Sequence, residues 1–121
     1  MADGSITDIQ AHIWLQEIAD NGWISLHYDN PGLGSSDAAE ISGGGYLRFK
    51  MVWRQPDNRT IWSQVDARFS GLTQNKIVYF GVWDSQYKGM LRAYAQLATP
   101  ELVLNGRGFV LNAGSIAISI G

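Results

Sequence analysis

The chain has 121 residues, of which 45% are apolar and 17% charged, with a net charge of −2 and no cysteine. This length and composition predict one folded domain with its own core, and they exclude general disorder, disulfide bonds and thiolate metal sites. Because the sequence has no cluster of Lys or Arg, no long apolar run and no basic leader, it does not support nucleic-acid binding, a membrane span or a signal peptide.

The first predicted element is a helix over residues 8–20, which follows a short arm at residues 1–7. Thr7 and Gln10 have the spacing of a capping box, and Gly22 suits the left-handed position just after a helix. The apolar stripe of this helix consists of Ile9, Ile13 and Ile18, with Trp14 beside them. A helix this short is marginal alone in water, so its stripe must pack on another surface. Because the connection at Asn21-Gly22 is short, we expect that surface to be the chain's own domain, with a neighbouring subunit as the alternative.

A strand that begins near Trp23 runs into the turn Pro31-Gly32 and a polar loop. The loop ends at Gly43-Gly44-Gly45, and an alternating strand follows at once. Glycine is required where φ is positive or where two backbones pass closely. We therefore expect Gly44 and Gly45 to form a tight hinge at the start of a sheet, with a flexible surface loop as the alternative.

Residues 46–54 and 60–69 alternate in polarity, which is typical of half-buried strands. The side chains assigned to the core side are Leu47, Phe49, Met51 and Trp53 in the first segment and Ile61, Val65, Ala67 and Phe69 in the second. Between the two segments, Gln55-Pro56-Asp57-Asn58 predicts a hairpin turn.

The C-terminal half predicts further strands. Residues 76–83 are apolar on both sides, so we expect a central strand in which Trp83 is structural. Residues 89–97 alternate again, and the apolar runs 101–104 and 107–111 flank Asn105-Gly106, a strong hairpin signal. The last strand contains Ile116, Ile118 and Ile120.

About eight short, evenly spaced strands after one helix predict a mainly β domain over residues 8–121. The expected architecture is a single antiparallel β-sandwich, jelly-roll-like, with a small closed barrel as the alternative. The pattern does not say which strands pair.

No catalytic, cofactor-binding or metal-binding residue is predicted, and we expect no enzyme activity. Ser25, His27 and Asp29 would stand in a row along one strand face rather than converge as a triad. The acidic residues of the 29–40 loop lack the spacing of a calcium-binding loop.

Four residues are candidates for an interface. Trp62 shares its strand face with polar side chains, among them Arg68, and such a tryptophan either anchors a protein contact or stacks on a sugar. A neighbouring loop that half covers it is the alternative. We favour a protein contact, add Tyr46 and Arg48 from the preceding strand, and expect self-association with a trimer as the first candidate.

Several short motifs follow one another in a fixed order: Ser25-Leu26-His27, Pro31-Gly32, Glu40-Ile41-Ser42-Gly43-Gly44-Gly45-Tyr46, Gly81-Val82-Trp83-Asp84 and Asn112-Ala113-Gly114-Ser115-Ile116-Ala117-Ile118. In this order the chain resembles the small stand-alone proteins of tailed bacteriophages and prophages that are labelled tail fibre or minor tail proteins. The resemblance covers most of residues 24–120.

The resemblance implies a non-enzymatic structural protein of the virion, made in the host cytoplasm, which acts in virion assembly or host attachment. Its expected partners are other virion proteins, further copies of itself and a host surface glycan, but neither nucleic acid nor a membrane. A capsid decoration protein is the first alternative, and a free carbohydrate-binding module is the second.

Overall fold

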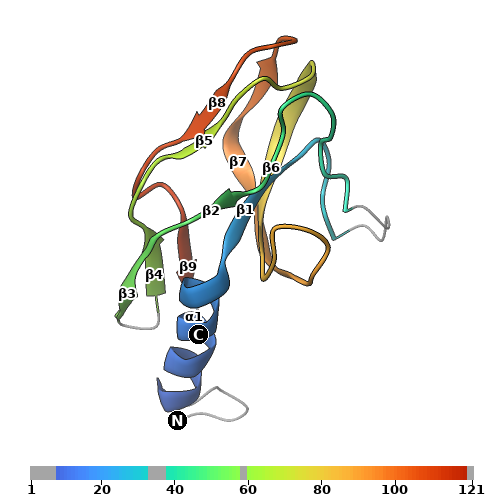
Figure 1. The fold of residues 1–121 in the computed structure, drawn as a ribbon. Coiled ribbons are helices and arrows are strands. Elements are labelled where there is room, and N and C mark those ends of the chain that lie inside the picture. The colour runs from blue at the N-terminus through green and yellow to red at the C-terminus, as the bar shows by residue number, and fades with distance from the viewer. Residues whose placement is uncertain (1–7, 33–37, 58–59, 120–121) are drawn as a thin grey trace.

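The computed structural model describes residues 8–32, 38–57 and 60–119 (Figure 1). In this part of the chain one helix, α1 (Asp8–Asn21), precedes nine antiparallel strands. The strands are β1 (Trp23–His27), β2 (Phe49–Lys50), β3 (Trp53–Asp57), β4 (Thr60–Ser63), β5 (Ala67–Phe69), β6 (Asn75–Trp83), β7 (Leu91–Val103), β8 (Phe109–Leu111) and β9 (Ala117–Ser119). The predicted mainly β fold with an N-terminal helix is confirmed.

The strands form three sheets, ordered β2-β1-β6-β7, β3-β4-β9 and β5-β8. The described strands do not close into a barrel, so the barrel alternative is wrong. β6 lies between β1 and β7, which confirms the prediction of a central strand. Its register sets Trp83 opposite Trp23 and Gly81 opposite Ser25.

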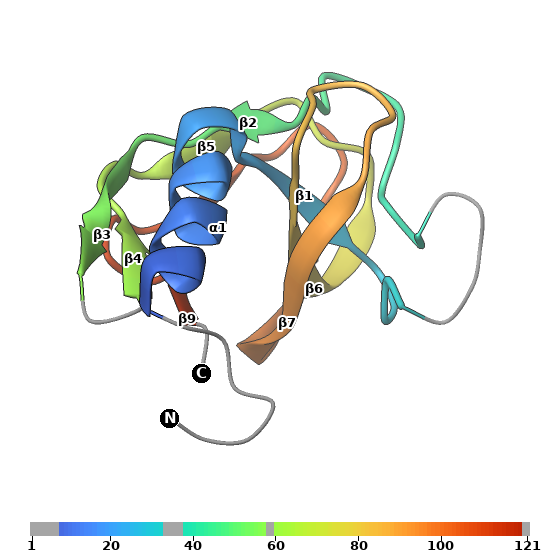
Figure 2. The ribbon, with the colours of Figure 1, turned by 90° about the horizontal axis from the view of Figure 1, so that it is seen from below.

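The helix packs on its own domain, as predicted, and of the predicted stripe Ile18 packs against the core whereas Ile13 does not. α1 contacts β3, β4 and β6, and Figure 2 shows it between the three-stranded and four-stranded sheets. Leu15 is fully buried, and Ile18 and Ala19 pack against the core, whereas Ile13 is 57% exposed. Ile13 lies about 200° around the helix from Leu15, so both cannot face the core. The side chains of Ile9 and Trp14 lie outside the described residues.

Two of the predicted strands are interrupted where the chain changes sheet. In residues 46–54 only β2 and the start of β3 are paired, in different sheets, and Leu47 is 55% exposed rather than part of the core. Residues 60–69 split into β4, which pairs with β3 and β9, and β5, which pairs with β8. Val65 lies at this bend and is 37% exposed. Alternation continues through such a bend although pairing does not, which is why the pattern alone predicted single strands.

Of the two predicted hairpins, the first forms, although three of its four predicted turn residues belong to a strand, and the second does not. Gln55-Pro56-Asp57 belongs to β3, an edge strand with an irregular register after Arg54, where proline is tolerated. β3 pairs antiparallel with β4, and Asn58 of the predicted turn lies outside the described residues. Asn105-Gly106 does form a turn, but β7 pairs with β6 and β8 pairs with β5, so no hairpin results.

The predicted segments 89–97 and 101–104 are one strand, β7. Ile77 pairs with Glu101 and Tyr79 with Gln96, so residues 97–100 form a bulge opposite a single residue of β6. The bulge includes Pro100, which has no amide hydrogen to donate to a neighbouring strand. Although β7 is a long edge strand, its edge is therefore interrupted.

The glycine hinge packs against the turn at residues 70–73. Gly43 and Gly44 have φ of 86° and 57°, and the amide of Gly45 donates to the carbonyl of Gly71 at 2.7 Å. A Cβ on Gly44 would lie 2.4 Å from that carbonyl oxygen. Gly44 thus combines a positive φ with a close approach to another backbone segment. The earlier turn at Pro31-Gly32 is closed by a side chain instead, since Asn30 Oδ1 accepts from the Gly32 amide.

We predict that Gly44→Ala destabilises the chain more than Gly106→Ala. Gly106 also has a positive φ, of 84°, but no atom lies within 4 Å of the position of a Cβ there. Gly106→Ala should cost about 1 kcal/mol from the backbone conformation alone. Gly44→Ala adds a backbone clash, and denaturant unfolding measures the difference. Equal losses for the two variants would contradict a crowded hinge.

Candidate functional site

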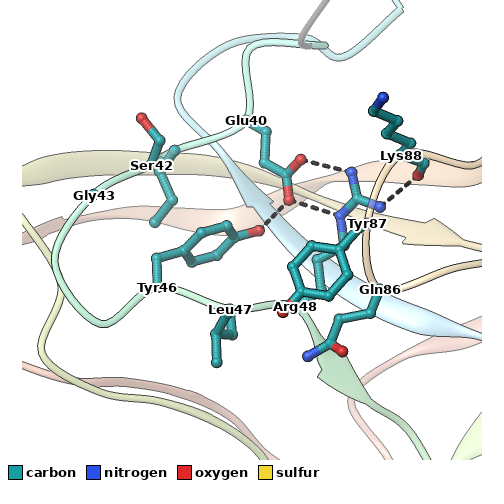
Figure 3. Close-up of a pocket in the computed structure, with 10 residues that line it drawn as sticks. Glu40, Ser42, Gly43, Tyr46, Leu47, Arg48, Gln86, Tyr87 and Lys88 are labelled. Atoms are coloured by element: carbon teal, nitrogen blue, oxygen red, sulfur yellow. Dashed lines mark hydrogen bonds and ion pairs between the residues drawn. The ribbon is translucent and has the colours of Figure 1, made fainter.

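Residues on both sides of the glycine hinge and the loop between β6 and β7 line an open pocket of about 400 Å³ (Figure 3). Two of the four interface candidates, Tyr46 and Arg48, line it. The other lining residues are Glu40, Ile41, Ser42, Gly43, Leu47, Gln86, Tyr87 and Lys88. The pocket thus joins residues about forty positions apart in the chain.

Arg48 and Glu40 form a two-bonded ion pair at the floor of this pocket. Arg48 Nε donates to Glu40 Oε2 at 2.9 Å, and Nη2 donates to Oε1 at 2.8 Å. The side chains are only 8% and 14% exposed. This planar geometry is the strongest that an arginine and a carboxylate can adopt, and each charge neutralises the other out of bulk water.

The same guanidinium fixes the loop between β6 and β7. Nη1 donates to the backbone carbonyls of Ser85 and Lys88, at 2.9 and 2.7 Å. The guanidinium carbon lies 3.8 Å from the centroid of the Trp83 ring, a cation–π contact. Inside the loop, Asp84 Oδ1 accepts from the Met90 amide at 2.8 Å. The loop is therefore held from beneath and closed at its base.

Tyr46 completes the floor. Its hydroxyl donates to Glu40 Oε2 and accepts from the Leu26 amide at 3.2 Å. Figure 3 shows the Glu40 carboxylate between this hydroxyl and the Arg48 guanidinium. Burial, followed by the negative charge of Glu40, raises the pKa of the Tyr46 hydroxyl well above its usual value. Tyr46 therefore stays protonated and acts as a donor.

A second buried chain of hydrogen bonds continues from Trp83. Its indole Nε1 donates to Ser25 Oγ at 2.8 Å, Ser25 Oγ lies 2.6 Å from His27 Nε2, and His27 Nδ1 lies 2.6 Å from the Ala38 carbonyl. A neutral imidazole with its proton on Nδ1 satisfies every group in this chain. A Cβ at Gly81 would lie within 2.8 Å of both Ser25 Oγ and His27 Nε2.

The contact between Ser25 and His27 is structural. Both side chains are fully buried, so no substrate reaches the hydroxyl. The second imidazole nitrogen faces a backbone carbonyl rather than a carboxylate, and Asp29 instead accepts from the Asn30 amide. The arrangement therefore lacks both the access and the third member that a hydrolytic triad requires.

Trp62 and Arg68, the other two interface candidates, lie elsewhere. Trp62 on β4 is half-buried beneath the Arg54 guanidinium, 4.5 Å from the ring centroid, and lines a second pocket of about 380 Å³. Arg68 on β5 is exposed and pairs with Asp66 at 2.9 Å. The four candidates thus belong to more than one surface.

The sequence did not single out the exposed apolar side chains at the mouth of the first pocket. Leu47 and Tyr87 are 55% and 67% exposed. Leu47 was assigned to the core from its alternation with Phe49, and Tyr87 lies in a loop without periodicity. The available signal was an aromatic residue among polar ones between two strong strands, in Asp84-Ser85-Gln86-Tyr87-Lys88. We call Leu47 and Tyr87 the pocket rim.

No helix in residues 8–32, 38–57 and 60–119 is long and apolar enough to cross a membrane. Within the same ranges, no three His, Asp or Glu side chains are grouped so that they could hold a metal ion. Glu40, from the acidic loop considered for calcium, is instead bound by Arg48 and Tyr46.

Residues 19–119 match the protein family described as podophage GP4 fiber I protein gp80. No curated protein matches the chain. The matched range runs from the end of α1 to β9 and includes both pockets. It confirms the resemblance to tail fibre proteins, and with it the predicted non-enzymatic role in the virion.

We predict that Tyr46 makes the folded chain less stable at alkaline pH. Its pKa is raised in the folded chain, so above the ordinary tyrosine pKa of about 10 the unfolded chain loses this proton while the folded chain keeps it. Stability should therefore fall as pH rises above that value, by up to about 1.4 kcal/mol per pH unit from this group. Denaturant unfolding across this pH range should show a shallower fall for Tyr46→Phe. Parallel pH profiles for parent and variant would contradict the role of Tyr46 as a buried donor.

Proposed function

Because the chain belongs to the family of the podophage GP4 fiber I protein gp80, we propose that it is a fibre subunit that contacts neighbouring virion proteins through the pocket rim. The observation that carries this proposal is a rigid loop that presents an exposed aromatic side chain, Tyr87, beside exposed Leu47. The family favours a place in the tail fibre over the alternative of capsid decoration.

The floor of the pocket suits burial under a partner. Glu40 and Arg48 already neutralise each other, and Arg48 also binds two backbone carbonyls. A partner that covers this floor therefore leaves neither Glu40 nor Arg48 with an unpaired charge, which would otherwise oppose association strongly. Above the floor, Leu47 and Tyr87 supply the apolar and aromatic area that anchors protein contacts.

The rim also needs little ordering before it binds. Arg48 holds the carbonyls of Ser85 and Lys88, and Ser85 Oγ donates to the Tyr87 carbonyl at 2.8 Å. Because the backbone of Tyr87 is already fixed, less conformational entropy is lost when a partner orders the loop.

The first partner that we propose is a further copy of the chain, with three copies as the expected assembly. The long edge of β7 is poorly suited to joining copies, since the bulge at residues 97–100 interrupts it. The pocket rim offers a side-chain surface instead. If the rim of one copy binds a different surface of the next copy, the contact is head-to-tail. Such contacts form a closed ring when the rotation that relates neighbouring copies divides a full turn evenly.

The test compares Leu47→Ser and Tyr87→Ser with Leu102→Ser, a matched control that is 59% exposed on β7. We expect all three proteins to fold with similar melting temperatures. The parent and Leu102→Ser should sediment as trimers and enter the particle normally. Both rim variants should sediment as monomers and enter purified virions at least about tenfold less, which corresponds to about 1.4 kcal/mol of binding free energy.

Rim variants that enter particles at the parental level would contradict the proposed contact surface. A parent that stays monomeric at high concentration would contradict self-association. If the rim variants of such a monomer still failed to enter the particle, the partner at the rim would be a different virion protein.

A further inference from the structure

We infer that the pocket beside Trp62 binds a pyranose ring of a carbohydrate. The inference goes beyond the proposed function, which concerns contacts between virion proteins, and it uses a different surface from the pocket rim. β3 and β4 lie on one side of α1, and the loop between β6 and β7 lies on the other (Figures 1 and 2). The two sites can therefore be changed independently.

The strand register determines what flanks the indole. In the sheet β3-β4-β9, Trp62 pairs with Arg54 on one side and with Ala117 on the other. The Arg54 guanidinium lies 4.5 Å from the ring centroid, whereas Ala117 is exposed and has only a methyl group. In the strand register the indole therefore has only the methyl group of Ala117 beside it on the β9 side, and the residues that line the pocket next to it include the small Ala113 and Gly114. The C–H face of a pyranose is apolar and matches the electron-rich face of an indole.

Polar groups that can hydrogen-bond to sugar hydroxyls lie near the indole. Gln64 supplies an exposed amide and Arg54 a guanidinium, and both line the same pocket. Thr60 and Ser119, the next pair along the same sheet face, hold their hydroxyls 3.0 Å apart. The volume of about 380 Å³ lies within the range of small-ligand sites, about 300–1,000 Å³.

The opposite wall of the pocket is fixed before any ligand binds. The Gly114 amide donates to the Ser63 carbonyl at 2.9 Å, and Ser63 Oγ accepts from Gly114 and Ile116. Asp66 Oδ1 accepts from the Ala113 amide at 2.8 Å. A preformed wall favours a ligand that binds weakly at the surface, because little binding free energy is then lost in ordering the protein.

The composition of this pocket favours a sugar over a protein partner. Its lining consists of Arg54, Trp62, Ser63, Gln64, Ala113 and Gly114. Among the residues that the structure describes there, Trp62 is the one large apolar side chain. A protein contact centred on tryptophan normally has further apolar residues around it that exclude water, as the pocket rim has in Leu47 and Tyr87. An indole with amide, guanidinium and hydroxyl neighbours suits a pyranose, because the apolar face of the sugar can stack on the indole while its hydroxyls bind the polar groups.

The experiment titrates the full chain with methyl pyranosides of glucose, galactose, mannose, rhamnose and glucuronic acid. Tryptophan fluorescence and the indole ¹H–¹⁵N signals report binding. We expect saturation by at least one of them at about millimolar concentration. Preference for the glucuronide over the neutral glycosides would identify the Arg54 guanidinium as a carboxylate contact.

Two variants test the site itself, and one serves as a control. Trp62→Ala should weaken binding at least about tenfold, which is about 1.4 kcal/mol. Ala117→Leu keeps the indole but places a larger side chain beside it on the β9 side. It should therefore weaken binding by a similar factor, and it tests the site even if Trp62→Ala folds poorly. Tyr87→Ser, in the pocket rim, should bind like the parent.

The inference is overturned if no glycoside gives a saturable change at tens of millimolar. It is also overturned if Ala117→Leu binds as tightly as the parent, because the sugar then lies elsewhere. If Trp62→Ala and Ala117→Leu abolish self-association or entry into the particle while no sugar binds, Trp62 is a protein contact instead. These outcomes differ from failure of the rim variants, which concerns the proposed function alone.

Discussion

The first pocket and the loop between β6 and β7 depend on the contacts that the Arg48 guanidinium makes. It binds the Glu40 carboxylate through two hydrogen bonds, stacks on Trp83 and holds two carbonyls of the loop between β6 and β7. A buried charge of this kind is stable only while its partners remain. Removal of one member of such a pair typically costs about 3–5 kcal/mol, because the other charge is left in a poorly hydrated place. Arg48 therefore stabilises the arrangement as a unit rather than through one contact.

Two hydrogen-bond networks meet at Trp83. On one side lies the Arg48 network, and on the other the indole donates to Ser25, which leads to His27 and the Ala38 carbonyl. Ala38 and Ala39 have φ of 54° and 55°, a conformation that non-glycine residues rarely adopt. The segment that carries Glu40 is thus held to β1 at one end and to Arg48 at the other. This arrangement keeps the proposed contact surface rigid.

Much of the local structure could be predicted from sequence. The predicted bounds of α1 are right to within a residue, and the apolar run at residues 76–83 identified β6 as central. Gly22 does not adopt the left-handed conformation predicted for it, and lies instead where a Cβ would be 2.6 Å from both the Ile18 carbonyl oxygen and Trp53 Nε1. What periodicity could not supply was the partner of each strand. Residues 60–69 alternate without interruption although β4 and β5 belong to different sheets, because a bend can preserve alternation.

The candidate site was harder to predict because it depends on distant backbone atoms. Tyr46 and Arg48 were selected as interface residues from their place on one strand face. In the fold, Arg48 instead reaches carbonyls 37 and 40 residues away and lies beneath the rim. No pattern of side chains predicts which carbonyl a guanidinium will meet. Trp62 was easier to recognise, since a tryptophan on a polar strand face is conspicuous in the sequence itself.

The most direct test of this account is hydrogen exchange in Arg48→Lys. A lysine keeps the charge but cannot form the two-bonded pair and hold two carbonyls at once. The account predicts that the Met90 amide and its neighbours in the loop lose protection, while amides of the central strand β6 keep theirs at the same temperature. Arg68→Lys, which changes an exposed ion pair, should leave both unchanged. If loop protection in Arg48→Lys equals that of the parent, Arg48 does not hold the loop, and the rigid rim has another cause.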